Sequence, residues 1–192
     1  MPSPRLIRFL YNQLAFAYEA TLALGARIGI SHELHIRRHL IANLEFPPGA
    51  HLLDLGCGTA AVRRYLPKHI HYVGLDFALY MLRRARPDSV AQGRLLCADL
   101  QSPPLRPHQF DVLFCMGVLQ HLPQPRHTLT QLPRLLRSGA QILILDEQQP
   151  FARSLGVPAS EVGSVCADLL GIPLGHTEII HEYLLIRLAA SD

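Results

Sequence analysis

Several residue types that mark particular protein classes are rare or missing in this sequence. Its 192 residues include no tryptophan and a single lysine, and only 17% of them are charged. No stretch approaches the roughly 18 uninterrupted apolar residues of a membrane-spanning helix. Because 49% of the residues are hydrophobic, the composition excludes a disordered tail, a collagen-like fibre and an array of small repeats. It predicts one compact domain without a membrane span.

Cysteine is also scarce, and its spacing does not suggest metal or disulfide chemistry. The four cysteines lie far apart and form no C-x-x-C pair: Cys57, Cys97, Cys115 and Cys166. This spacing argues against a zinc ribbon and against a secreted disulfide framework. We therefore expect no metal site and a protein of a reducing compartment, the cytoplasm.

The N-terminal residues contain an apolar stretch that only faintly resembles a signal peptide. Asn12 and Gln13 interrupt it, whereas Leu10, Leu14 and Ala17 recur at the spacing of one helix face. An amphipathic helix explains this pattern better than a secretory signal does.

Basic residues are not gathered into a binding stripe. The net charge of +3 comes almost wholly from arginine, and the longest basic cluster is formed by Arg83, Arg84 and Arg86. Nucleic-acid-binding proteins more often combine a basic stripe with interleaved aromatic residues. We expect this cluster to be a solvated helix face and expect no nucleic-acid partner. The oligomeric state is not indicated.

Two periodicities divide the chain. Residues 1–45 have a largely helical pattern and are predicted to be an N-terminal helical cap segment, which ends at Pro47-Pro48-Gly49. Residues 46–192 alternate short apolar runs with stretches of helical length, which is typical of strands buried on both faces and joined by crossover helices. The predicted fold class is α/β, a doubly wound, mostly parallel Rossmann-like sheet with helices on both faces. The expected strands are 51–55, 70–75, 94–97, 112–116 and 141–145, the expected helices include 60–66, 79–85, 129–136 and 160–170, and residues 177–188 form one long strand or two short ones.

The residues that follow the expected strands have the chemistry of a ligand site. In such sheets, ligands bind outside the carboxyl ends of the strands, where the strand order reverses. Gly56 and Gly58 follow the first strand and allow a tight turn and a close approach of the backbone to a ligand. Asp76 lies 20 residues after Gly56, where a carboxylate can accept hydrogen bonds from both hydroxyls of a ribose. Asp99 follows the third strand and can accept one from an exocyclic amine. The pattern predicts a nucleoside ligand.

Two kinds of nucleoside cofactor fit this pattern. The segment 56–61 formally matches the dinucleotide fingerprint G-x-G-x-x-G/A. However, a pyrophosphate would meet acidic residues at the strand ends, namely Asp54, Asp99, Asp146 and Glu147. S-adenosylmethionine carries a sulfonium and an ammonium against one carboxylate and is a net cation. The acidic rim therefore favours S-adenosylmethionine, and NAD or FAD is the alternative.

Five segments resemble, in order and spacing, the motifs of class I S-adenosylmethionine-dependent methyltransferases. They lie within residues 46–147 and comprise Leu52–Thr59, Val73–Asp76, Cys97–Leu100, Phe110–Phe114 with Val118–Leu122, and Leu136–Ala140. Residues 11–19 are similar to the Y-x-x-x-A-x-x-Y-D/E segment of the menaquinone and ubiquinone methyltransferases. The resemblance implies that S-adenosylmethionine is the cofactor and that a methyl group is transferred to a small-molecule acceptor.

The resemblance also implies roles for individual residues. The two tyrosines of the N-terminal segment would flank the sulfonium, and residues after the first strand would hold the methionyl part. Asp76 would bind the ribose, and residues after the second and third strands would bind the adenine. The expected cofactor-binding residues are Tyr11, Tyr18, Asp54, Gly56, Cys57, Gly58, Asp76, Phe77, Asp99, Leu100 and Met116.

Three further positions have open or structural interpretations. His121 follows the fourth strand and is either a general base facing the acceptor or a structural residue that packs a helix start. Asp111 begins that strand at the opposite edge, so we expect it to be structural. Ala60 stands where the family has a third glycine and adds a methyl group beside the ligand. This departure and the short region after the fifth strand leave open a non-catalytic protein that binds the cofactor and keeps the fold.

Overall fold

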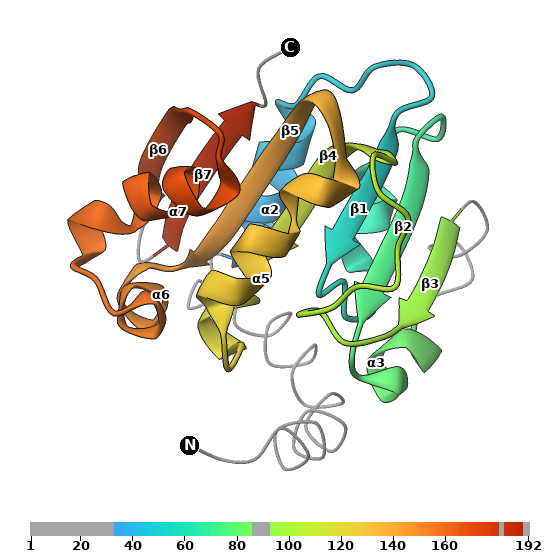
Figure 1. The fold of residues 1–192 in the computed structure, drawn as a ribbon. Coiled ribbons are helices and arrows are strands. Elements are labelled where there is room, and N and C mark those ends of the chain that lie inside the picture. The colour runs from blue at the N-terminus through green and yellow to red at the C-terminus, as the bar shows by residue number, and fades with distance from the viewer. Residues whose placement is uncertain (1–32, 86–92, 181–182, 190–192) are drawn as a thin grey trace.

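A computed structural model describes residues 33–85, 93–180 and 183–189 of the chain. Within these ranges, the chain forms one seven-stranded sheet in the order β3-β2-β1-β4-β5-β7-β6 (Figure 1). Strands β1 to β5 are parallel, and β7 runs antiparallel to both β5 and β6. The strands are β1 (His51–Leu55), β2 (His71–Asp76), β3 (Gly93–Cys97), β4 (Phe110–Met116), β5 (Leu136–Glu147), β6 (Leu174–Ile180) and β7 (Tyr183–Ala189). The predicted fold class is confirmed.

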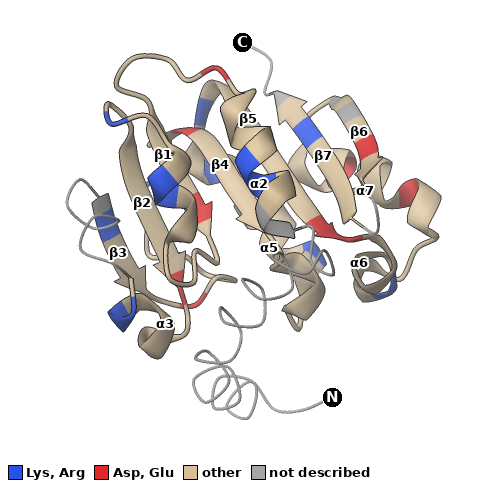
Figure 2. Ribbon diagram, turned by 180° about the vertical axis from the view of Figure 1, so that it is seen from behind, with Lys and Arg blue, Asp and Glu red and all other residues tan. Residues whose placement is uncertain are grey.

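Helices cover both faces of the sheet (Figures 1 and 2). One face is covered by α2 (Glu33–Ala42) and the 3₁₀ helix η1 (Ala61–Tyr65), and the other by α5 (Pro125–Gln131), α6 (Gln148–Leu155) and α7 (Val162–Leu170). The shorter elements are α3 (Leu79–Arg83), η2 (Leu119–His121), η3 (Pro133–Leu135) and η4 (Ala159–Glu161). None of the described helices combines the length and the hydropathy that a membrane crossing requires.

The alternation of side chains along β1 explains why the sheet has two cores. Leu53 and Leu55 pack in the cluster that contains Phe151 of α6, whereas Leu52 packs in the cluster that contains Leu40 of α2. Successive side chains of a strand point to opposite faces, so a continuous apolar run buries both faces at once. All five of these side chains are almost completely buried.

The predicted strands agree with the observed ones, but the predicted helices agree less well. The stretch 60–66 forms only η1, because Leu66 precedes Pro67 and is extended at ψ 147°. The helix expected over 129–136 lies closer to the N-terminus: Pro125 begins α5, and Leu136 already begins β5. Helix α6 was not predicted. Of the two alternatives for residues 177–188, the structure has the two short strands, β6 and β7, which pair antiparallel.

The order of the strands fixes where a ligand site belongs. The chain passes from β1 to β2 and β3 on one side, and β4 then pairs with the other side of β1. The strand order therefore reverses between β1 and β4. Their carboxyl ends flank the point where open α/β sheets bind ligands.

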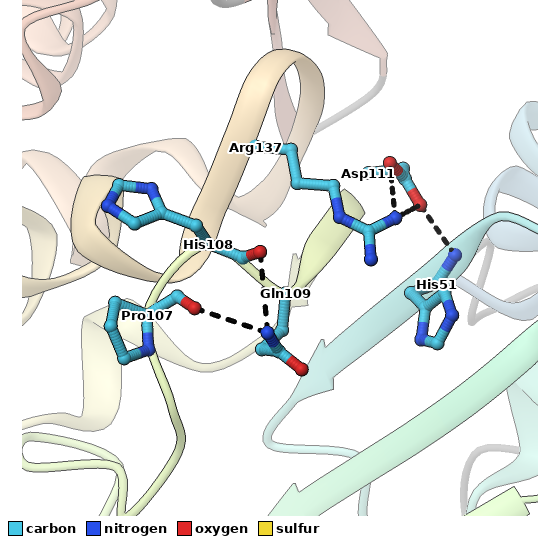
Figure 3. Close-up of polar contacts among 6 residues, drawn as sticks. All are labelled: His51, Pro107, His108, Gln109, Asp111 and Arg137. Atoms are coloured by element: carbon cyan, nitrogen blue, oxygen red, sulfur yellow. Dashed lines mark hydrogen bonds and ion pairs between the residues drawn. The ribbon is translucent and has the colours of Figure 1, made fainter.

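The opposite edge of the sheet holds an ion pair (Figure 3). Asp111 at the start of β4 accepts a hydrogen bond from the backbone N–H of His51 at 2.8 Å, and Arg137 Nη1 lies 2.9 Å from its Oδ2. Burial, with Arg137 and His71 nearby, lowers the pKa of His51 and favours its neutral ring, which lies 4.7 Å from the ring of His71. The structural role expected for Asp111 agrees with these contacts.

We predict that Asp111→Ala lowers the free energy of unfolding by about 1–3 kcal/mol, because a charged hydrogen bond to a backbone N–H is lost. Arg137→Ala should lower it by only ~0.2–1 kcal/mol, since it removes a partly exposed ion pair and leaves that hydrogen bond intact. Urea unfolding of both variants tests this difference. Equal losses would contradict the importance of the hydrogen bond to His51.

Candidate functional site

The carboxyl edge of the sheet gathers the site residues predicted within the described part of the chain. Figure 2 shows acidic residues at the ends of β1, β2 and β5. The predicted residues at or after the carboxyl ends of β1, β2, β3 and β4 are Asp54, Gly56, Cys57, Gly58, Asp76, Phe77, Asp99, Leu100, Met116 and His121. Tyr11 and Tyr18 lie outside the described residues.

The turn after β1 requires glycine at its first position. Gly56 has φ +76°, and its N–H donates to the carbonyl oxygen of Leu75 at 2.7 Å. A Cβ at this position would lie 2.3 Å from Cγ2 of Val118, so the turn and the loop after β4 are in direct contact. Gly58 has φ +55°, where a side chain is also strained. Both glycines are explained by backbone geometry.

Two other residues of this turn face the protein core. Ala60 has φ +55°, a left-handed conformation that costs a residue with a side chain roughly 1–2 kcal/mol. It is fully buried in the hydrophobic cluster beneath α2, so its methyl group packs in the core and not on an exposed surface. Burial also raises the pKa of the Cys57 thiol, with Asp54 and Asp76 adding to the shift. Cys57 can thus contribute its backbone to a site more readily than its side chain.

Asp54 lies buried on the face covered by α2. Its Oδ2 accepts a hydrogen bond from the Tyr72 hydroxyl at 2.6 Å. Burial raises the pKa of Asp54 to about 6, and the Tyr72 hydrogen bond and the charge of Arg37 limit the shift. The side chain is therefore mostly ionised at neutral pH.

Asp76 joins the turn after β1 to the segment after β2. Its Oδ2 accepts a hydrogen bond from Gly58 N–H at 2.8 Å, and its Oδ1 accepts one from Ala78 N–H at 2.8 Å. Burial raises the pKa of Asp76, while these backbone hydrogen bonds lower it. A carboxylate oxygen has two acceptor positions, so each can also accept a hydrogen bond from a ligand hydroxyl.

The residues expected around an adenine differ in exposure. Asp99 is exposed, and its Oδ1 accepts a hydrogen bond from Gln101 N–H at 2.9 Å. Leu100 is only 2% exposed and belongs to the hydrophobic core, against which the half-buried Phe77 packs. Phe77 and Asp99 are therefore more accessible to a ligand than Leu100.

The loop after β4 lies against the turn after β1 and continues into η2. The backbone oxygen of the buried Met116 accepts a hydrogen bond from Nη2 of Arg37 on α2 at 2.7 Å. Gly117 N–H donates to the carbonyl oxygen of Leu145 at 2.6 Å. His121 is exposed on η2, with its Nε2 3.2 Å from the amide nitrogen of Gln120.

Asp146 is not part of the exposed, charged acidic rim that the sequence predicted. It is completely buried, and its Oδ2 accepts a hydrogen bond from Leu119 N–H at 3.2 Å. Burial raises the pKa of Asp146 to about 8, although backbone hydrogen bonds and Arg37 oppose the shift. The side chain is therefore mostly neutral at pH 7. One of the four acids that were expected to favour a cationic cofactor therefore carries little charge at pH 7.

Sequence reasoning missed three residues that organise this edge. Tyr72 holds Asp54, Arg37 binds the backbone of Met116, and Val118 covers Gly56. A polar tyrosine within an apolar strand is a weak signal that could have identified the first. The contacts of the other two depend on how distant segments pack.

We predict that Gly56→Ala destabilises the fold more than Gly156→Ala does. Both positions have a strongly positive φ, but a Cβ at Gly156 would have no heavy atom within 4 Å. Gly156→Ala should cost about 1–2 kcal/mol for the left-handed conformation alone. Gly56→Ala should cost roughly 1–3 kcal/mol more, because Val118 has to move. Denaturant unfolding of the two variants separates the cost of the left-handed conformation from the cost of moving Val118. Similar losses of unfolding free energy would show that the contact with Val118 does not restrict position 56.

We also predict that removing the acid at position 146 flattens the pH dependence of stability. A carboxyl whose pKa is about 8 in the folded protein and ~3.9 when unfolded stabilises fully below pH ~4 and loses that contribution as the pH rises to 8. Asp54 contributes in the same direction, but only up to about pH 6. Between pH 6 and 8, the unfolding free energy of Asp146→Asn should fall less steeply than that of the parent, by at most about 1.4 kcal/mol per pH unit.

Denaturant unfolding at pH 6, 7 and 8 measures this slope. Glu147→Gln is the matched control, because it makes the same change from acid to amide at the next residue of β5. The same slope in Asp146→Asn as in the parent would show that Asp146 does not titrate in this range.

The sequence has relatives among curated methyltransferases. Residues 53–144 match the family model of a methyltransferase domain. The demethylmenaquinone methyltransferase of Lactiplantibacillus plantarum is 29% identical over 132 residues, which are 64% of this chain and 56% of that protein. The ubiquinone biosynthesis O-methyltransferase of Aeromonas salmonicida is 30% identical over 105 residues, 50% of this chain and 42% of that protein. The chain therefore spans about half the length of these curated relatives.

The fold is also that of solved methyltransferases. The TehB-like S-adenosylmethionine-dependent methyltransferase from Corynebacterium glutamicum matches 93% of this chain and 98% of its own with a TM-score of 0.67 at 19% identity. The order of the strands, the glycine turn after β1 and the family match all indicate the same methyltransferase fold. Residues 53–144 of this chain therefore match a methyltransferase domain, and the described sheet has the fold of solved S-adenosylmethionine-dependent methyltransferases.

Proposed function

We propose that this chain transfers a methyl group from S-adenosylmethionine to a small-molecule acceptor. The observation that carries the proposal is the joint position of the Gly56–Gly58 turn and the Asp76 carboxylate, which touch at the carboxyl ends of β1 and β2, beside the point where the strand order reverses. Sheets of this kind bind nucleoside ligands there. The names of the quinone-related relatives support a small-molecule acceptor.

The residues at this edge have the chemistry that S-adenosylmethionine requires. Both Asp76 oxygens already accept backbone N–H groups, which orients the carboxylate, and each can accept a further hydrogen bond from a ribose hydroxyl. The exposed Asp99 would accept a hydrogen bond from the adenine amine, and Phe77 would offer the base an apolar surface. On the family resemblance, Tyr11 and Tyr18 would lie beside the sulfonium.

The protein's part in the reaction is mainly alignment. When bound, S-adenosylmethionine supplies a methyl group on a positively charged sulfur, so the leaving group needs no acid. The chain has to orient the acceptor in line with that methyl group and exclude water. We assign His121 the role of a general base, needed only for an acceptor that must lose a proton. The amide nitrogen of Gln120, 3.2 Å from His121 Nε2, would donate to that nitrogen and has to move aside before the ring accepts a proton there.

One observation keeps a dinucleotide-binding protein as the second candidate. Because Asp146 is mostly neutral at pH 7, it would repel a pyrophosphate less than the sequence suggested. The segment 56–61 also matches the dinucleotide fingerprint. A cofactor-binding protein without methyl transfer differs from the enzyme only in turnover. The preference for S-adenosylmethionine over NAD and FAD distinguishes a methyltransferase from a dinucleotide-binding protein. Formation of S-adenosylhomocysteine with a panel of phenols, quinols and amines distinguishes the enzyme from a protein that only binds the cofactor.

We predict that S-adenosylhomocysteine binds and that Asp76→Asn weakens its binding by about 1.5–3 kcal/mol, because the ribose loses a charged acceptor. Isothermal titration calorimetry measures both affinities. Asp111→Asn is the matched control, since it removes a carboxylate at the opposite edge of the sheet, and it should bind like the parent. Tight binding of NAD or FAD without binding of S-adenosylhomocysteine would overturn the proposed function.

A further inference from the structure

The 3₁₀ helix η2 lacks a capping side chain of its own. Val118 occupies its N-cap position, with φ −126° and ψ −53°, and makes no side-chain cap hydrogen bond. The first amide of η2 instead finds its acceptor on another strand, because Leu119 N–H donates to Oδ2 of Asp146 at 3.2 Å. The backbone N–H groups of Val118 and Gln120 also favour the charged form of this carboxyl and so lower its pKa. A residue at the end of β5 thus caps the loop that follows β4.

This loop contacts both halves of the proposed site. On one side, the Val118 side chain lies where a Cβ of Gly56 would be, so its position limits that of the turn after β1. On the other side, η2 carries His121, the side chain assigned to the acceptor, and its neighbour Gln120. A change in the cap would therefore move the donor side and the acceptor side together.

The surroundings of Asp146 indicate that its carboxyl is not there for packing alone. It is fully buried, and among the described residues no donor lies within hydrogen-bond distance of its second oxygen, Oδ1. The titratable groups that influence it or are influenced by it are Arg37 on α2, Cys115 on β4 and Cys166 on α7. A buried acid with an unsatisfied oxygen costs stability relative to an apolar residue of similar size. The contribution that offsets this cost is the capping of the loop.

We propose that Asp146 is a positioning residue: by accepting the amides of the loop after β4, it holds Val118 against Gly56 and presents Gln120 and His121 to the acceptor. The inference rests on the proposed function for its effect on the cofactor. Its effect on the loop does not depend on any ligand. Asparagine can replace the acid in this role, because its amide oxygen accepts the same hydrogen bonds, whereas alanine cannot.

Amide hydrogen exchange of the full chain, read by NMR, tests the loop without ligand. In Asp146→Ala, we expect the Leu119 and Gln120 amides to exchange about tenfold faster or more than in the parent, because their acceptor is lost. In Asp146→Asn, they should stay within about threefold of the parent. Asp111→Ala, which is destabilised at the opposite edge, is the control and should leave these two amides unchanged.

Calorimetry with S-adenosylhomocysteine tests the consequence for the cofactor side. The dissociation constant should rise about tenfold in Asp146→Ala and be restored in Asp146→Asn. If Asp146→Ala does not fold, Asp146→Leu replaces it, since leucine fills the volume without an acceptor.

The outcomes separate the two proposals. The positioning role is overturned if the alanine or leucine variant has the amide exchange rates and the S-adenosylhomocysteine affinity of the parent. It is also overturned if the asparagine variant behaves like the alanine variant. If the parent binds no S-adenosylhomocysteine, the proposed function fails, while the exchange rates still decide whether Asp146 holds the loop.

Discussion

The close approach of two loops at the switch point of the sheet is the constraint on which the site depends. Gly56 has no side chain, and Val118 occupies the space that a side chain would need. The parallel pairing of β1 with β4 brings these loops to the same edge, and the positive φ of Gly56 turns the chain back under Val118. Without this contact, the turn after β1 and the loop after β4 would be positioned independently.

Buried carboxyl groups then hold the edge together. Asp54 accepts from Tyr72, Asp76 accepts from Gly58 and Ala78, and Asp146 accepts from Leu119. Each of these acids lies at the end of a strand and binds a group from another segment. Their contribution as hydrogen-bond acceptors is therefore at least as important as their charge, and for Asp146 it is the main contribution because its pKa is raised to about 8.

The parts of the fold that could be predicted are those with a local signal. Apolar runs of strand length marked β1 to β5, because a strand buried on both faces has no polar alternation. The acid at the end of β2 and the glycines after β1 were found from their spacing. Helix α6 was not predicted. Residues 61–65 form only a 3₁₀ helix, because Pro67 disfavours a helical conformation of Leu66. Leu100, which is expected beside the ligand, is buried and belongs to the hydrophobic core.

The sequence by itself determined the α/β alternation, the glycine turn and the positions of the acids, since each depends on residue type and spacing along one segment. Only the tertiary structure decided which acids keep their charge, which loop covers Gly56 and which residue caps η2. The physical reason is that burial, and with it the pKa of Asp146, depends on segments that are distant in the chain. The Leu119 amide and its acceptor are separated by 27 residues and meet only when β4 and β5 pair.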